Sequence, residues 1–236
     1  MKLLALDASA KVATAALYES GMLRGEVSLN DTLTHSETMM PMIDTLLHWA
    51  SVDVTELDFI ACAQGPGSFT GLRIGAATAK GLAHGLGIPI IPVPTLDALA
   101  YNLGENPRLI CPMMDARRQQ VYTAAYAWER GTFRQLVPQA ARSVEEMIQI
   151  CRASGRETVF LGDGVPVYQD LLEREERFYL APPNCMYQRA ASVGALGLEL
   201  LAMGQTAPAA EFQPIYLRKP QAERELEERQ KRGERP

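Results

Sequence analysis

Histidine and cysteine are scarce in this chain of 236 residues. The three histidines, His35, His48 and His84, never recur four residues apart, which is the spacing of a helical metal pair. The four cysteines lie far apart in the sequence and form no CxxC motif or Cys/His ligand set. We therefore expect no metal site, and cysteines that pack as small apolar side chains in a reducing compartment. The cysteines are Cys62, Cys111, Cys151 and Cys185.

Long apolar runs are also missing. The run from Leu3 to Leu6 is shorter than the ~7 to 15 apolar residues of an export signal, and no stretch reaches the ~18 residues of a membrane span. We expect a soluble, cytoplasmic protein that does not enter a membrane. The net charge of −5 argues against a broad nucleic-acid-binding surface, so any such contact would have to be local or supplied by a partner.

One pattern occurs twice along the chain. Leu3 to Leu6 is an apolar run that ends in Asp7, as expected of a buried strand with a polar residue at its carboxyl end, and residues 12–18 read as a second strand. The same succession returns in residues 109–115, which also end in aspartate, and in residues 121–128. Strands and helices alternate after each copy. The sequence therefore predicts a duplicated α/β fold with two lobes, each a mixed β-sheet flanked by helices.

We place the first lobe in residues 1–105 and the second in residues 106–220. Residues 221–236 are rich in charges of both signs, which predicts a solvated, flexible tail. Further strands are expected at residues 59–63, 88–93 and 159–161. Further helices are expected at residues 36–50, 69–86, 96–103, 168–174 and 190–203, with one more that Ser143 opens as N-cap.

Two of the predicted helices have distinctive faces. Residues 36–50 place Met39, Met42, Ile43 and Leu46 on one apolar face. Residues 69–86 carry a small side chain at every fourth position, namely Gly71, Gly75, Ala79 and Ala83. Glycine costs ~1 kcal/mol relative to alanine inside a helix, so a compensating close approach is expected. The stripe either packs tightly on its own sheet or forms a subunit interface.

A glycine-rich loop joins a strand to the second of these helices. Glycines let a ligand approach the main chain, and the helix N-terminus offers free N–H groups to a phosphate. The loop is not a Walker A motif, because Leu72-Arg73 stand in place of Lys-Ser/Thr. A phosphate loop and a purely structural turn both remain open. The candidate ligand-binding residues are Gly65, Gly67, Ser68, Thr70 and Gly71.

Asp7 and Asp115 end the two equivalent strands. Carboxylates at such positions orient metal-bound water or phosphate in phosphoryl-transfer enzymes. The alternative is that they cap the turns that follow, through local side-chain hydrogen bonds.

Five segments together resemble the TsaB family, formerly called YeaZ. They are LLALDAS (residues 3–9), QGPGSFTGLRIG (64–75), MMDARRQQVY (113–122), FLGDGV (160–165) and PIYLRKP (214–220). The resemblance implies an actin/hexokinase-like (ASKHA) fold with a shortened second lobe. It also implies an obligatory partnership with TsaD, which transfers a threonylcarbamoyl group to tRNA adenosine, and with the small ATPase TsaE. We expect a homodimer in the absence of the partner, and contact with tRNA only through the complex. We also expect no tightly bound cofactor in the isolated chain, with ATP or ADP at the partner interface.

The catalytic relative of this family carries a His-x-x-x-His metal pair after the strand that corresponds to residues 88–93. Thr95 and Leu99 stand at those positions here, and leucine cannot ligate a metal. The resemblance therefore implies a non-catalytic protein, in which Asp7 and Asp115 are vestigial phosphate-motif carboxylates. The implied partner surface is the helix pair described above. Its expected contacts are Met39, Met42, Ile43, Leu46, Leu72, Arg73, Gly75, Ala76, Ala79 and Lys80.

Two enzyme classes compete with this interpretation. An ATP-dependent kinase or ATPase of the same superfamily would use Asp7 and Asp115 to organise a metal, and would turn over ATP by itself. A glycoprotease-like metallopeptidase would need a metal pair or a nucleophile with a base, and the sequence displays neither.

Overall fold

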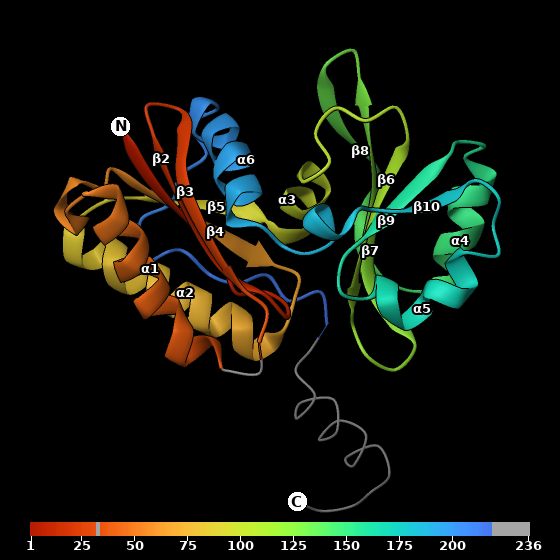
Figure 1. Cartoon of the computed structure of the whole chain (residues 1–236), viewed down its shortest axis with the longest axis horizontal. Helices are drawn as coiled ribbons and strands as arrows, with labels where there is room; N and C mark the ends of the chain where they lie inside the picture. Colours follow the sequence, from red (N-terminus) through yellow and green to blue (C-terminus); the bar gives the residue numbers. More distant parts are fainter. Residues whose placement is uncertain (32–33, 219–236) are drawn as a thin grey trace, which may run out of the picture.

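The computed structural model describes residues 1–31 and 34–218, which form two lobes, each built on a five-stranded β-sheet (Figure 1). In the first lobe the strand order is β3-β2-β1-β4-β5, and β1 runs antiparallel to β2 and parallel to β4. Because β1 is the central strand, both of its faces are covered, which explains its continuously apolar sequence. The strands are β1 (Lys2–Asp7), β2 (Ala13–Glu19), β3 (Met22–Leu29), β4 (Phe59–Gly65) and β5 (Ile90–Pro94).

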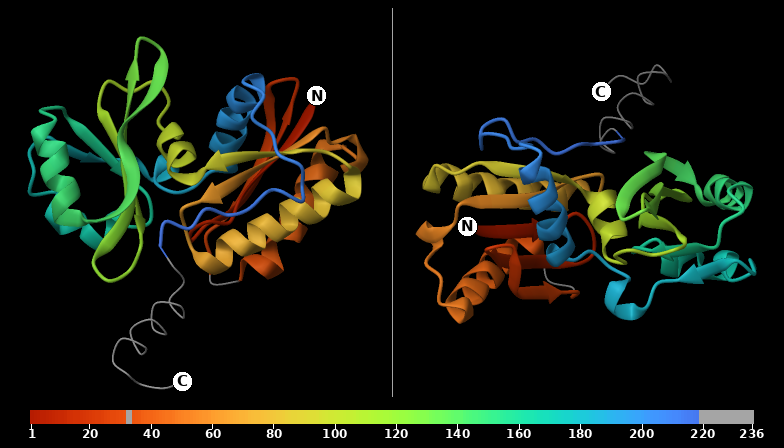
Figure 2. Two further views of the ribbon diagram at one scale, coloured as in Figure 1. Left: turned by 180° about the vertical axis from the view of Figure 1, so that it is seen from behind. Right: turned by 90° about the horizontal axis from the view of Figure 1, so that it is seen from above.

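Helices cover both faces of the first sheet. α1 (His35–Ala50) and α2 (Phe69–Leu86) lie side by side on one face, and α6 (Ala190–Ala202) lies on the other (Figure 2). Each face has its own apolar core, one with α1 and α2 and one with α6. A short 3-10 helix, η1 (Val54–Glu56), leads into β4.

The second lobe repeats this architecture. Its strand order is β10-β9-β6-β7-β8. Read from β8 to β10, this is the first lobe's order with β1 to β5 replaced by β6 to β10. α4 and α5 cover one face, and α3 (Thr95–Tyr101) lies against the other, between the lobes. The predicted duplicated α/β fold is therefore confirmed. The remaining elements are β6 (Leu109–Asp115), β7 (Gln120–Glu129), β8 (Thr132–Ser143), β9 (Thr158–Leu161), β10 (Phe178–Leu180), α4 (Val144–Ala153), α5 (Val165–Leu172) and η2 (Pro183–Cys185).

The predicted C-terminal limit of the second lobe is wrong. α6 packs against β1 and β2, and the Tyr18 hydroxyl donates a 2.6 Å hydrogen bond to the carbonyl of Ala191. Residues 203–218 then run along the first lobe, where Phe212 is buried in the core with α1 and α2. The chain therefore returns to its first lobe, and only residues from about β6 to η2 build the second. The charged tail expected at residues 221–236 lies outside the described part of the chain.

Candidate partner surface and interlobe site

The apolar face of α1 packs on its own sheet. Met39, Met42, Ile43 and Leu46 are at most 7% exposed and join Leu17 of β2 in one core. A sheet face is stable only when another layer covers it, and α1 supplies part of that layer. The prediction that these four residues contact a partner is therefore wrong, because the chain itself buries them.

The stripe of small residues on α2 also faces the chain's own backbone. A Cβ atom on Gly71 would lie 2.0 Å from the carbonyl oxygen of Ala8, and one on Gly75 would lie 3.5 Å from the Ala8 Cβ. Close packing on the first lobe is thus the interpretation that the structure supports, and the subunit-interface interpretation of this stripe is wrong. The predicted contacts that are buried with it are Leu72, Gly75, Ala76 and Ala79.

A second row of α2 faces outward. Its members, Arg73, Ala77, Gly81 and Gly85, are spaced four residues apart and are all exposed. Apart from the backbone of α2 itself and the neighbouring residues, no atom of the described residues comes within 4 Å of a Cβ built on Gly81 or Gly85. Packing inside the chain therefore does not account for two glycines that weaken this helix. This row was not predicted from the sequence, although its four-residue spacing of small side chains is visible there.

Exposed apolar and basic side chains accompany the outer row. On α1, Met40 is 47% exposed and Trp49 is 75% exposed. On α2, the Arg73 guanidinium lies 3.9 Å from the centre of the Phe69 ring, which presents a cation over an aromatic face. Of the predicted partner contacts, Arg73 thus remains available at the surface. Lys80 is half-buried.

The C-terminal segment holds Lys80 and covers the glycine loop. The Lys80 Nζ donates to the carbonyls of Ala210 and Phe212 at 3.2 and 3.1 Å, and the Ile215 N–H donates to the carbonyl of Gln64 at 2.8 Å. Beyond these contacts, the Arg218 guanidinium donates a 2.7 Å hydrogen bond to the carbonyl of Ala116 in the second lobe. The segment is therefore a strap that joins both lobes.

The glycines of the loop before α2 make room for this chain's own backbone. A Cβ on Gly65 would lie 2.3 Å from the carbonyl oxygen of Ile215, and one on Gly67 would lie 2.3 Å from that of Ser9. Ser68 donates its N–H to the same Ser9 carbonyl at 2.6 Å. Thr70 is exposed, and Gly71 packs on Ala8 as described above. Of the two interpretations, the geometry favours the structural turn, because internal contacts already require each glycine.

Asp7 and Asp115 both accept hydrogen bonds from the turns that follow their strands. The Asp7 Oδ1 accepts from the Ser9 N–H at 2.7 Å, and the Asp115 Oδ1 accepts from the Arg117 N–H at 2.8 Å. The turn-capping alternative is thus realised in both lobes. Asp7 is almost fully buried, and this desolvation raises its pKa to about 6. Asp115 is exposed.

Asp163, after β9, joins Asp7 and Asp115 in one interlobe site, because its charge acts on the buried Asp7 carboxyl and its side chain contacts Asp115. Its Oδ1 accepts the Asp115 N–H at 3.1 Å, and burial raises its pKa, as does the nearby Asp115 charge to a lesser extent. Asp163 lies in one of the segments that carry the family resemblance, residues 160–165, but no role was predicted for it from the sequence. Its place after a strand of the duplicated unit, like that of Asp7, is the signal that could have identified it.

α3 occupies the position where a metal pair was considered. The Thr95 Oγ1 accepts the Gly65 N–H at 2.9 Å, and Leu99 is 1% exposed in the core between the lobes. Asp97 accepts hydrogen bonds of 2.6 Å from the Tyr126 hydroxyl and from the Gln139 amide, both in the second lobe. These side chains tie the lobes together. Across residues 1–31 and 34–218, no group of three or more His, Cys, Asp or Glu side chains could hold a metal ion.

The duplicated lobes place the chain in a known structural class. Two sheets with the same strand order, each with an antiparallel hairpin at its start and parallel strands after it, define the actin/hexokinase-like fold. A family model described as "TsaD: tRNA N6-adenosine threonylcarbamoyltransferase" matches residues 27–226.

In the described residues, no helix has the length and apolar character needed to cross a membrane.

Individual relatives match over nearly the whole chain. The tRNA threonylcarbamoyladenosine biosynthesis protein TsaB of Bacillus subtilis is 32% identical over 234 residues, which cover 98% of this chain and 100% of that protein. The Escherichia coli protein of the same name is 28% identical, covering 92% and 95%. A solved structure, YeaZ from Pseudomonas aeruginosa, has a TM-score of 0.77 at 27% identity, covering 92% of this chain and 99% of that one. The chain belongs to the TsaB family, within the wider group that the family model describes.

Proposed function

We propose that this chain is a non-catalytic partner and activator of the TsaD transferase in the formation of N6-threonylcarbamoyladenosine in tRNA. The full-length match to proteins named for this biosynthesis supports the pathway. The outer row of α2 is the structural observation that carries the partner role, because exposed small residues at every fourth position allow another helix to approach closely. The structural use of Thr95 and Leu99 supports the absence of catalysis by this chain.

The proposed docking surface differs from the one expected from the sequence. It comprises the outward side chains of α1 and α2, chiefly Met40, Arg73, Ala77, Gly81 and Gly85. The same surface would pair two copies of the chain when TsaD is absent, so self-association and TsaD binding would compete. We further propose that ATP or ADP binds at the interface with TsaD, that TsaE joins as a third component, and that the protein acts in the cytoplasm.

Size-exclusion chromatography of the chain mixed with TsaD tests this surface. Gly81→Arg places a long charged side chain where close approach is required, and the high helix propensity of arginine makes it compatible with the exposed helix. The variant should remain folded and lose both the TsaD complex and self-association. Val167→Arg, at a side chain 60% exposed on α5 of the second lobe, is the matched control and should keep both. A folded Gly81→Arg protein that co-elutes with TsaD like the wild type would show that the surface is misplaced.

A further inference from the structure

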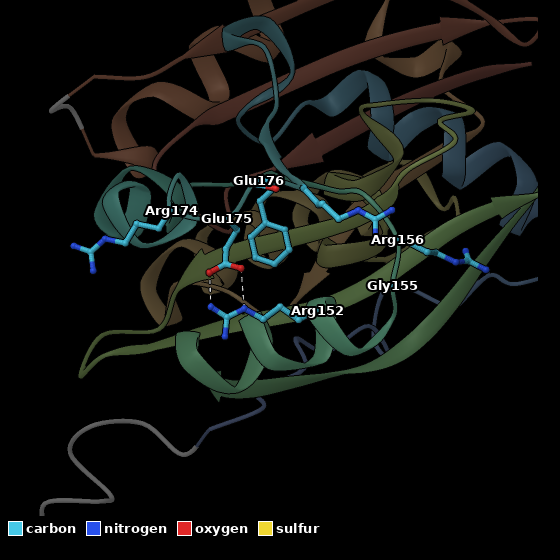
Figure 3. Close-up of a pocket in the computed structure, with 8 residues that line it drawn as sticks. Arg152, Gly155, Arg156, Arg174, Glu175 and Glu176 are labelled. Carbon is cyan, nitrogen blue, oxygen red and sulfur yellow. Dashed lines mark hydrogen bonds and ion pairs between the residues drawn. The ribbon is translucent and has the colours of Figure 1, made fainter.

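A basic pocket lies at the outer edge of the second lobe, between the end of α4 and the loop that leads into β10 (Figure 3). Its volume is about 360 Å³. Four arginines and two glutamates line it, although the whole chain carries a net charge of −5. The lining residues are Arg152, Gly155, Arg156, Arg174, Glu175, Glu176, Arg177 and Phe178.

Only part of this positive charge is neutralised within the chain. Arg152 forms a two-point ion pair with Glu175, whose Oε2 lies 2.8 Å from the arginine Nε. Arg156 reaches Glu129, outside the pocket, at 3.4 Å. In the described part of the chain, neither Arg174 nor Arg177 forms an ion pair or side-chain hydrogen bond. Two guanidinium groups therefore have unused donors.

The arrangement of these groups suits an extended anion. Arg174 and Arg156 extend from opposite ends of the pocket, with the Arg152–Glu175 pair between them (Figure 3). The guanidinium group binds phosphate oxygens through two parallel N–H donors, so arginines spaced along an edge can contact successive phosphates. The half-buried Phe178 ring adds an aromatic wall. Arginine beside aromatic rings is typical of surfaces that bind single-stranded or looped RNA.

The same edge continues beyond the pocket. The Arg108 guanidinium lies 3.9 Å from the centre of the Tyr179 ring, which is next to Phe178 in β10. Arg108 also pairs with Glu157 at 3.1 Å. The strand β10 is an edge strand of its sheet, so these arginines and rings form one accessible border of the second lobe.

We propose that this pocket binds backbone phosphates of tRNA, with Arg174 and Arg177 as the principal contacts. The inference rests on the proposed function, which supplies tRNA as the nucleic acid. It also refines that function, because the chain would touch the RNA directly at the edge of its second lobe. The contact is local, as the net negative charge of the chain requires.

The test is the binding of fluorescently labelled tRNA to the full chain, measured by anisotropy as a function of salt. The wild type should bind at low salt, with an affinity that falls as salt rises. Arg174→Gln combined with Arg177→Gln should weaken binding several-fold at low salt, and the slope of log affinity against log salt should become shallower by about one for each arginine replaced. Both side chains are exposed, so the fold should be kept.

Lys11→Gln combined with Arg24→Gln is the matched control, because it removes the same charge from exposed sites in the first lobe. Control binding should equal that of the wild type. Equal tRNA affinity for the pocket variant and the control would overturn the proposal, as would a wild type that binds no tRNA at low salt. The proposal would also be overturned if the pocket variant lost binding of pyrophosphate or ATP but kept wild-type binding of tRNA. The pocket would then serve a free nucleotide. TsaD binding by the pocket variant, measured in parallel, separates this outcome from failure of the proposed function.

Discussion

Single residues at the interlobe site and on α2 show where the chain accepts a cost to stability. Asp7 is a carboxylate buried at the end of β1, where the Ser9 N–H donates to it and offsets part of its desolvation. Gly71 and Gly81 lie on the same helix, but one is pressed against the Ala8 carbonyl and the other borders open space. The cost at Gly71 is explained by packing inside the chain. The cost at Gly81 is not, and such a residue is expected where a surface serves a function.

Asp7→Asn should change how stability depends on pH. The Asp7 pKa is raised from 3.8 to about 6 in the folded state, so between about pH 4 and 6 the folded chain holds a proton that the unfolded chain releases. The free energy of unfolding contributed by this group therefore falls as pH rises through that window, by about 3 kcal/mol at most. Urea unfolding of both proteins should show that the advantage of the Asp7→Asn variant over the wild type grows from pH 4 to pH 7. Parallel stability profiles would contradict the assignment.

Gly71→Ala and Gly81→Ala should shift stability in opposite directions. The methyl group added at Gly71 would lie 2.0 Å from the Ala8 carbonyl oxygen, so the backbone must move, at a cost of about 1 to 3 kcal/mol or more. The methyl group at Gly81 meets no described atom, and the better helix propensity should stabilise the fold by about 0.5 to 1 kcal/mol. Urea denaturation midpoints measure both. Equal effects would mean that α2 does not approach the β1–β2 turn as described.

Among the elements, strongly periodic helices and buried strands were predictable, and those that depend on long-range contacts were not. The helices expected at residues 36–50 and 69–86 correspond to α1 and α2. β3 and β8 were missed because they are hairpin partners whose residues are exposed or half-buried, without a clear apolar alternation. The helix expected at residues 168–174 begins at Val165 instead, because Pro166 fits the first turn of α5.

The candidate site was predictable only in part for the same reason. Periodicity identified the two special helices. An apolar or small-residue face has the same sequence pattern whether it packs on a sheet of its own chain or on a partner. In the structure both faces pack on the first lobe, because strands distant in sequence bring Ala8 and Leu17 against α1 and α2. Three cysteines are buried as expected, whereas Cys185 is only half-buried in η2.

The C-terminal strap should contribute to stability through Phe212. This ring is 2% exposed in the first-lobe core, and truncation of a buried phenylalanine to alanine typically costs about 3 to 5 kcal/mol. Tyr216, 38% exposed and 4.9 Å from the Phe69 ring centre, should cost only about 0.5 to 1.5 kcal/mol when replaced by alanine. Thermal unfolding of Phe212→Ala and Tyr216→Ala compares them. Similar decreases in stability would indicate that the strap is held by its backbone contacts alone.

For the whole molecule, two lobes joined by α3 and the strap form a scaffold with separate surfaces. α1 and α2 lie on the first lobe, and α4 and β10, which border the arginine-lined pocket, lie on the second (Figure 1). If the chain bridges an enzyme and its RNA as proposed, separate surfaces would let both partners bind at once. The polar contacts of Asp97 across the lobes would hold the two surfaces in fixed relation.

The most direct test of the central claim is threonylcarbamoyladenosine formation in unmodified tRNA by purified TsaD and TsaE, supplied with threonylcarbamoyl adenylate and ATP. We predict that modification depends on adding this chain, that the chain alone modifies no tRNA, and that Gly81→Arg reduces the stimulation while Val167→Arg does not. Full modification without the chain, or modification by the chain alone, would contradict the proposal that it is a non-catalytic activator of TsaD.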